Sequence, residues 1–178
     1  YAKDFYEIPE SLTNNSSLKR KALDLVQSEP IAGKVTTGGS RLEDFREILI
    51  DFFDLQIDLD VAIAETENRL PRHQSMFSSD NRVFPSGWAE RLVRTQVSRF
   101  YNQAVLETII ENGSDDCFVY HSSSEQSSSK CSQQLAGATH SAHVMLERLK
   151  LSYGDGEWNN DRKIPDHPHC THTFSPVQ

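Results

Sequence analysis

The end of the chain holds a dense group of side chains that can bind a metal. His167, His169, Cys170 and His172 fall within six residues, and nearby prolines stiffen the backbone that carries them. Zinc binds four cysteine or histidine side chains tetrahedrally, usually as two close pairs from separate segments of a chain. Cys170 with His172 or His167 forms one such pair. The sequence therefore predicts that a second pair comes from elsewhere in the chain.

The second pair has several candidates upstream, which are Cys131, Cys117, His121, His140 and His143. No C-x2-C pair is present, and the spacing alone does not choose among these residues. The alternative interpretation is that the histidines are exposed residues of the tail. The cysteines would then be ordinary small hydrophobic residues, since free cysteine is commonly buried.

The bulk composition predicts a folded domain with a real hydrophobic core. The 178 residues are 37% hydrophobic and 25% charged, close to the average of globular proteins. The longest apolar stretch, residues 48–59, is interrupted by three aspartates, so no segment approaches the ~20 apolar residues of a bilayer-spanning helix. Because the chain begins at Tyr1 without an initiator methionine, we expect a processed product or part of a longer chain.

The net charge of −8 weighs against a broad DNA-binding surface, since duplex binding relies on Lys and Arg that neutralise phosphates. A metal or a protein partner fits this charge better. A local basic strip is the alternative, formed by Lys19, Arg20 and Lys21 or by Arg91, Arg94 and Arg99. The odd number of cysteines, three, argues against a secreted disulfide framework and indicates a reducing interior.

The first half of the chain predicts an arm followed by a long helix. Residues 1–40 mix polar runs with one short amphipathic piece at 18–26, which is typical of an arm or linker. Apolar residues are so dense between Ser40 and residue 70 that we expect one continuous buried helix over 41–70. Acidic and apolar residues alternate near Asp54, which leaves a strand or a helix break there as the alternative. Pro71 ends the helix, and a polar loop follows up to residue 84.

The second half predicts one secure helix and a mixed lobe. Apolar residues recur at three- and four-residue steps over 88–110, which is the helical period, and Ser86 is the expected N-cap. Residues 117–121 read as a short β-type run, and the serine-rich stretch 122–129 as a solvated loop. A further helix is expected over 133–151, and the tail after it is loop or short strand.

Residues 89–104, A-E-R-L-V-R-T-Q-V-S-R-F-Y-N-Q-A, carry a resemblance to a known family. They resemble the helix of tailed-phage head morphogenesis (minor head) proteins of the Mu F type, whose pattern is Ala-Arg-Thr-Glu followed by Arg and Asn. Arg94, Thr95, Arg99 and Asn102 match that pattern, whereas Gln96 stands in place of the usual Glu.

The resemblance continues downstream through an aromatic strand, a cysteine pair followed by Leu-x-Gly, and a closing His-Pro-x-Cys-x-Cys. The strand is similar to residues 118–121. The second cysteine, the glycine and the closing motif fall on Cys131, Gly137, His167, Pro168, Cys170 and His172. Ser128 stands where the first cysteine of the pair is expected, and His172 where the last cysteine is expected. The resemblance thus implies a zinc site built from Cys131, His167, Cys170 and His172.

The resemblance covers residues 85–178, and with the patterns of the first half it gives a division of the chain into three parts. These are an N-terminal arm or linker over 1–40, a long helix and loop over 41–84, and a Mu F-like core over 85–178. The expected fold is α+β and mainly helical, with long helices and a small C-terminal lobe that contains β-structure and is closed by the Cys/His cluster.

The function that the resemblance implies is structural, with no catalytic residues. The protein would be a minor virion component in the phage head or at the portal vertex, present in multiple copies and assembled in the host cytoplasm. The implied partners are the portal and the major capsid protein, with packaged DNA as a further candidate. Because few large apolar residues occur between 122 and 178, a structural zinc would stabilise the last lobe directly.

Two other functional classes remain as alternatives. A zinc- or thiol-dependent enzyme, such as a toxin-like domain, would use Cys131 or Ser129 with His140 and an aspartate, but no Gly-x-Ser-x-Gly, phosphate loop or H-E-x-x-H occurs. A nucleic-acid-binding module would use the basic strip. Arg94 and Arg99 also have a structural interpretation, in which they form surface pairs with glutamates or contact carbonyls of the C-terminal lobe.

Overall fold

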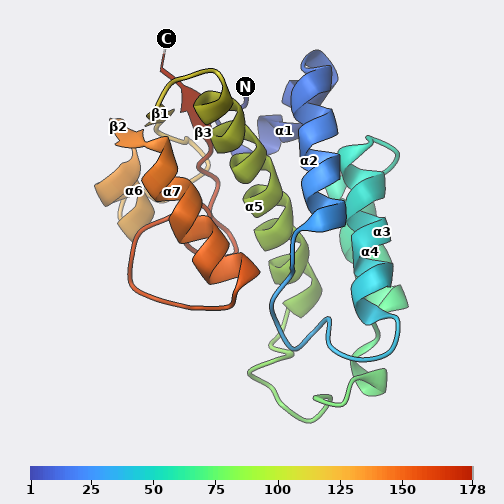
Figure 1. Cartoon of the computed structure of the whole chain (residues 1–178). Helices are drawn as coiled ribbons and strands as arrows, with labels where there is room; N and C mark the ends of the chain where they lie inside the picture. The colour runs from blue at the N-terminus through green and yellow to red at the C-terminus, as the bar shows by residue number, and fades with distance from the viewer. Residues whose placement is uncertain (178) are drawn as a thin grey trace.

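The computed structural model describes residues 1–177, which form a layer of long helices beside a smaller lobe with a sheet (Figure 1). The α-helices are α1 (Ile8–Asn14), α2 (Ser16–Ser28), α3 (Arg41–Phe53), α4 (Leu59–Arg69), α5 (Trp88–Glu111), α6 (Lys130–Leu135) and α7 (Ala142–Leu149). The strands are β1 (Asp116–Val119), β2 (Ala138–Ser141) and β3 (Phe174–Pro176). The expected α+β class, with long helices and a small C-terminal sheet, is confirmed.

Helix α5 is the centre of the fold. It packs against α2, α3 and α4 on one side and against α7 and β3 on the other. Its apolar side chains include Val93, Val97, Phe100 and Val105, all fully buried. The helix predicted over 88–110 is confirmed. The predicted cap is wrong, however, because the helix begins after Gly87, whose φ of 72° lies in the left-handed region that glycine adopts without strain.

The continuous helix expected over 41–70 is wrong, because the segment forms two helices that pack against each other. Helix α3 ends at Phe53, and Leu55 takes a φ of 65°. Asp58 then caps α4 by accepting a hydrogen bond from the backbone N–H of Val61 at 2.9 Å. A carboxylate that caps a new helix competes with continuation of the previous one, which explains the break in the acidic stretch.

The first 40 residues pack into the common core instead of extending away from it. They contain two α-helices, α1 and α2, where one short helix was expected. Phe5, Ile8, Leu12 and Ala22 are buried in the same cluster of apolar side chains as the residues of α3 and α5. The expected arm or linker is therefore part of the folded body.

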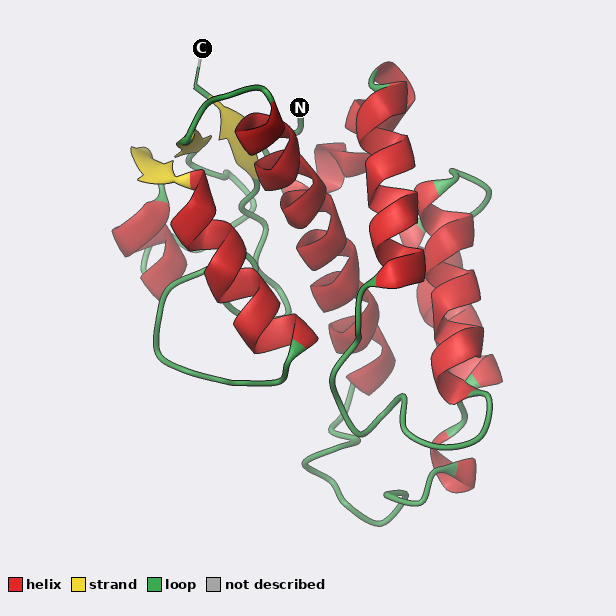
Figure 2. Ribbon diagram, in the orientation of Figure 1, coloured by secondary structure: helices red, strands yellow, loops and turns green. Residues whose placement is uncertain are grey.

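The C-terminal lobe is built on a sheet with strand order β2-β1-β3, in which both pairs are antiparallel (Figure 2). The helix expected over 133–151 is wrong, since α6, β2 and α7 share that segment. Gly137 takes a φ of 76°, in the left-handed region that glycine adopts without strain, which stops the chain from continuing α6 as a helix. It also lies so close to the His121 ring that a side chain would clash with it. Ser141 then caps α7 by accepting from the backbone N–H of Val144. Among residues 1–177, no helix has the length and apolarity needed to cross a membrane.

Candidate metal centre

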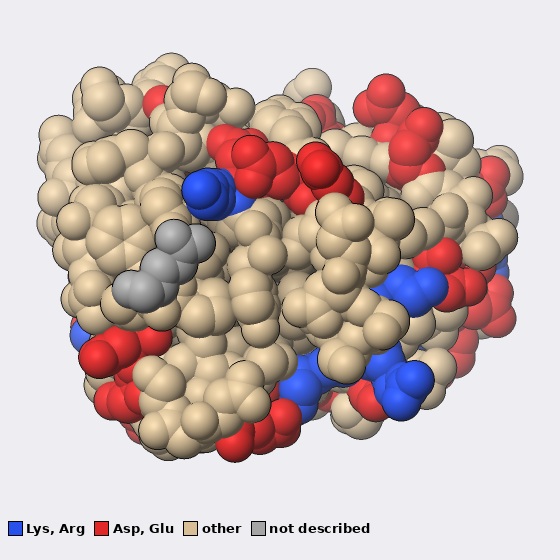
Figure 3. All heavy atoms as spheres, turned by 90° about the horizontal axis from the view of Figure 1, so that it is seen from above, with Lys and Arg blue, Asp and Glu red and all other residues tan. Residues whose placement is uncertain are grey.

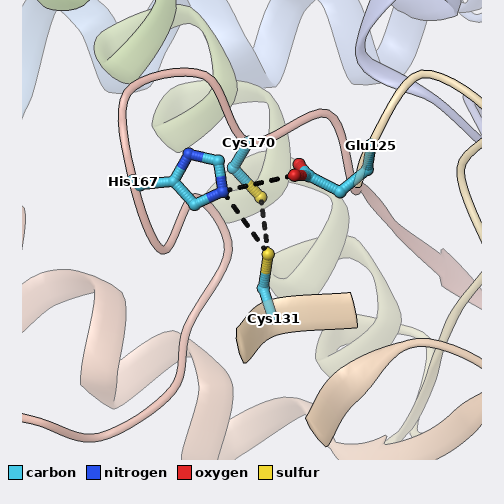
Figure 4. A group of neighbouring side chains, drawn as sticks. All are labelled: Glu125, Cys131, His167 and Cys170. Atoms are coloured by element: carbon cyan, nitrogen blue, oxygen red, sulfur yellow. Dashed lines mark hydrogen bonds and ion pairs between the residues drawn. The ribbon is translucent and has the colours of Figure 1, made fainter. Parts of the chain in front are cut away.

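Four side chains from three separate segments converge in the lobe. The ligand atoms of Glu125, Cys131, His167 and Cys170 all lie within 4.8 Å of one another (Figure 4). Two of these residues come from upstream of β2 and two from the tail, as a split zinc site requires. This group can hold a metal ion.

Local structure fixes each side chain of the group. Cys131 lies in the first turn of α6, which Ser129 caps by accepting from the backbone N–H of Ser132 at 3.2 Å. In the tail, the backbone N–H of Cys170 donates to the carbonyl of His167 at 3.0 Å, and this turn brings the two side chains to the same side. Glu125 is held from the tail as well, because its Oε2 accepts from the backbone N–H of Thr171 at 3.0 Å.

The three short contacts within the group share two atoms, Cys131 Sγ and His167 Nε2. Cys131 Sγ lies 3.6 Å from His167 Nε2 and 3.8 Å from Cys170 Sγ, and Glu125 Oε1 lies 3.5 Å from the same Nε2. A catalytic Cys-His-Glu relay would use one ring nitrogen toward the thiol and the other toward the carboxylate. Here both contacts fall on one nitrogen. The arrangement converges on a common point, as ligands do around an ion.

Burial and hydrogen bonding set the charges of the group. Cys131 and Cys170 are 0% and 1% exposed. A hydrogen bond from the Cys170 thiol lowers the pKa of Cys131 strongly, with further lowering by His167, while the same contact and burial raise the pKa of Cys170. The Cys131 thiolate in turn raises the pKa of His167. These shifts favour the thiolate at Cys131 and the thiol at Cys170, and a bound cation would favour thiolates at both.

Three of the four residues predicted for the site lie in the group, and the fourth, His172, lies outside it. Cys131, His167 and Cys170 come together, whereas His172 lies beside the group and Glu125 takes the fourth place. The His172 Nδ1 donates to the Tyr120 carbonyl at 3.2 Å, and its Nε2 accepts from the Ser132 hydroxyl at 2.9 Å. His172 thus ties the tail to β1 and α6 in this structure.

Sequence reasoning missed Glu125. It lies in the serine-rich loop, close to Ser128, where the resemblance expects a cysteine. Ser128 itself is exposed and outside the group, so a carboxylate from the same loop occupies the region where a thiolate was expected. The only signal in the sequence was an acidic residue among serines and glutamines, which has no specific meaning alone.

The other candidate ligands lie elsewhere. Cys117 is buried in β1, where its S–H donates to the His140 carbonyl and burial raises its pKa to about 12. His140 Nε2 donates to the Leu135 carbonyl at 2.8 Å. His143 pairs with Asp115 at 2.7 Å on the surface, and His121 packs against Gly137. The half-exposed His169 lies 3.9 Å from Glu90.

Two side chains of the motif on α5 connect separate parts of the fold. Arg99 is fully buried and donates to the carbonyls of Pro30 at 2.8 Å and Tyr153 at 3.1 Å, so the expected contact with carbonyls of the lobe is confirmed for it. Asn102 Oδ1 accepts from the backbone N–H of Phe174 at 2.8 Å, which ties α5 to β3.

The proposed basic strip on α5 is wrong, because Arg94 and Arg99 are buried. Arg94 lies over the Phe5 ring and donates to the Tyr6 hydroxyl. Near the N-terminus, Lys19 and Lys21 pair with Asp54 and Glu111, which reduces their free charge. Figure 3 shows a face that is mostly uncharged, with small acidic and basic groups beside one another.

Comparison of the chain with family models, with curated proteins and with solved structures found no match.

Proposed function

We propose that Glu125, Cys131, His167 and Cys170 bind one zinc ion that stabilises the C-terminal lobe. The proposal depends on one observation, which is the convergence of two thiols, an imidazole and a carboxylate within 4.8 Å. Thiolate and imidazole ligands favour zinc over magnesium or calcium, which prefer oxygen ligands. The burial of both sulfurs suits an ion that holds chain segments together.

We propose further that the protein acts as a minor head protein in phage head assembly, at or near the portal. This part depends on the resemblance carried by Arg94, Thr95, Arg99 and Asn102 and by the cluster residues. Two of these residues, Arg99 and Asn102, link α5 to the lobe, which suits a scaffold that presents a surface to a partner. The net charge of −8 favours a protein partner such as the portal or the major capsid protein over packaged DNA.

Elemental analysis of the purified chain tests the zinc site. We expect one zinc per chain, lost in Cys170→Ser together with thermal stability. Cys117→Ser is the matched control, because Cys117 is also buried but lies outside the group, so this variant should keep its zinc. A chain without metal, whose melting temperature ignores chelators, would overturn the proposal.

Isolation of assembled heads tests the role in assembly. We expect the chain to copurify with portal rings in several copies per particle, and heads made without it to be defective. Heads that assemble and package normally in its absence would contradict the role. Steep, salt-dependent affinity for DNA would instead favour the nucleic-acid-binding alternative.

A zinc enzyme is the second candidate, favoured by a pocket beside the group. The pocket has a volume of about 410 Å³, is lined by Ser124, Gln126, Ser129 and His169, and reaches the two ligands Glu125 and His167. A catalytic zinc keeps an open position for water. Cobalt substitution distinguishes the two, because azide should leave the visible spectrum of a closed site unchanged and shift that of an open one.

A further inference from the structure

Residues 170–176, here called the tail strap, have two functional faces. Cys170, His172 and Phe174 alternate along one side, where they contact the metal group, α6 and the core. Thr171, Thr173 and Ser175 occupy the alternate positions, as in any extended chain with a two-residue period.

The second face holds the start of the chain. The Thr171 carbonyl accepts from the backbone N–H of Phe5 at 2.7 Å. The hydroxyls of Thr173 and Ser175 both donate to the Ala2 carbonyl, at 2.8 and 3.1 Å. All three strap residues are at most 5% exposed, so these hydrogen bonds are shielded from water.

Thr171 connects this face to a metal ligand. Its backbone N–H donates to Glu125 Oε2, and its hydroxyl lies 2.7 Å from that of Ser122. The Ser122 hydroxyl in turn donates to Asp4, which caps the first turn of the chain. One residue next to Cys170 therefore contacts both the metal group and the N-terminal segment, here defined as residues 1–7.

The chain that precedes the tail strap has few apolar anchors of its own. Between residues 155 and 173, the buried apolar side chains are Ile164, Pro165 and Cys170. Ordering each residue of such a segment has a cost in backbone entropy that few apolar contacts offset here. A metal bound through His167 and Cys170 would fix the position of Thr171 directly.

We propose that metal binding tightens the docking of the N-terminal segment on the tail strap and that metal loss loosens it. This inference rests on the proposed metal site. Because coupling between two sites is reciprocal, docking of the segment must tighten metal binding by the same factor. The segment also has contacts outside the tail strap, because the Ala2 N–H donates to the Tyr101 hydroxyl at 2.7 Å and Phe5 is buried in the core, so the change on metal loss is local. Helix α1 stays in place in both states, since Ile8 and Leu12 are buried in the core and Ser11 bonds the hydroxyl of Tyr101.

Hydrogen exchange of the full chain, with zinc and after chelation, tests this loosening. We expect the Phe5 amide and its neighbours to exchange at least about tenfold faster without zinc, while the amides of α3 do not change. Equal exchange of residues 1–7 in a chain that binds zinc would overturn the coupling and leave the metal site standing. A chain that binds no zinc would overturn both.

The reciprocal test removes the hydrogen bonds from the tail strap to the Ala2 carbonyl and measures zinc affinity by competition with a chelator of known affinity. In Thr173→Val with Ser175→Ala, both hydroxyls that hold Ala2 are lost, while neither residue belongs to the metal group. We expect zinc affinity to fall about fivefold or more, the lower end of measured couplings. Thr108→Val is the matched control, because its hydroxyl bonds only within α5. Unchanged affinity in the double variant would contradict the coupling.

Discussion

Helix α3 and the segment 155–173 are held in the fold by different means. The 13 residues of α3 bury five large apolar side chains, which are Phe45, Ile48, Leu49, Phe52 and Phe53. The longer segment 155–173 buries only three apolar side chains, those of Ile164, Pro165 and Cys170, and has no regular secondary structure. Burial of each large apolar side chain contributes about 1.5–3 kcal/mol, so apolar contacts supply most of what positions α3. Arg41 and Arg46 add hydrogen bonds to carbonyls of neighbouring segments.

Helix α3 and the segment 155–173 should therefore respond to different changes of conditions. The position of α3 depends on the volume and shape of its side chains, which zinc and mild changes of pH do not alter. The segment 155–173 depends on polar contacts and on ligands that must lose protons before they bind a metal. The two regions should therefore respond differently to the same treatments.

The largest effect is expected in the helical half. Phe53→Ala removes a fully buried ring and leaves a cavity, which should lower the free energy of unfolding by about 3–5 kcal/mol. Urea denaturation should give the same loss with zinc and with a chelator present. A loss that depends on zinc would show that the stability of the helical half is coupled to metal binding in the lobe.

Metal removal should give the next largest effect. At free zinc about 100 times the dissociation constant, binding contributes about 2.7 kcal/mol, which corresponds to a fall of roughly 5–11 °C in the melting temperature on chelation. Hydrogen exchange should rise in residues 155–173 and stay constant in α3. Equal protection of both regions after chelation would remove the distinction.

A pH series should change the free energy of zinc binding by about 1.4 kcal/mol per pH unit for each proton that binding releases. The contacts of α3 have no such dependence. Cys170, whose pKa is raised, must release its proton to bind zinc, so zinc affinity should rise about tenfold per pH unit near neutrality. Below the raised pKa of His167 a second proton is released, which steepens the dependence. Titration with zinc in buffers of different ionisation enthalpy counts these protons, and an uptake without proton release would contradict the ligand set.

The metal-free protein should behave differently over the same range. The raised pKa of His167 gives stability that is present below its unfolded value and lost as pH rises through the folded one. The lowered pKa of Cys131 gives stability that is present above its unfolded value and lost as pH falls. From about pH 6.5 to the raised pKa of His167, each state of this pair holds one proton, so its contribution should be flat.

The same contrast explains how much of the structure could be predicted from the sequence. The helix over 88–110 was predicted because its apolar residues recur every three or four positions, a pattern that can be read from that segment alone. The break at Leu55 was given only as the alternative near Asp54, because the apolar density on both sides of it is typical of a helix, although Asp58 was a readable cap. The strand at 138–141 was missed because its antiparallel pairing with β1 defines it, and that pairing exists only in the folded chain.

Three of the four group members, Cys131, His167 and Cys170, were predicted from residue type and motif order. Glu125 could not be, because a carboxylate in a serine-rich loop becomes a candidate ligand only when Thr171 holds it against the tail. For the same reason, the position of His172 beside the group follows from its bonds to Tyr120 and Ser132, which no spacing encodes.

The smallest effect compares two helix caps that do the same job in the two regions. Asp58→Ala removes the cap of α4, and Ser129→Ala removes the cap of α6 next to Cys131. Each should lower the free energy of unfolding by about 1 kcal/mol. Only Ser129→Ala should also weaken zinc binding, because its hydroxyl lies 3.2 Å from Cys131 Sγ and its cap holds the turn that presents this sulfur. If Asp58→Ala weakened zinc binding equally, the metal site would depend on global stability, and the independence of the two regions would be lost.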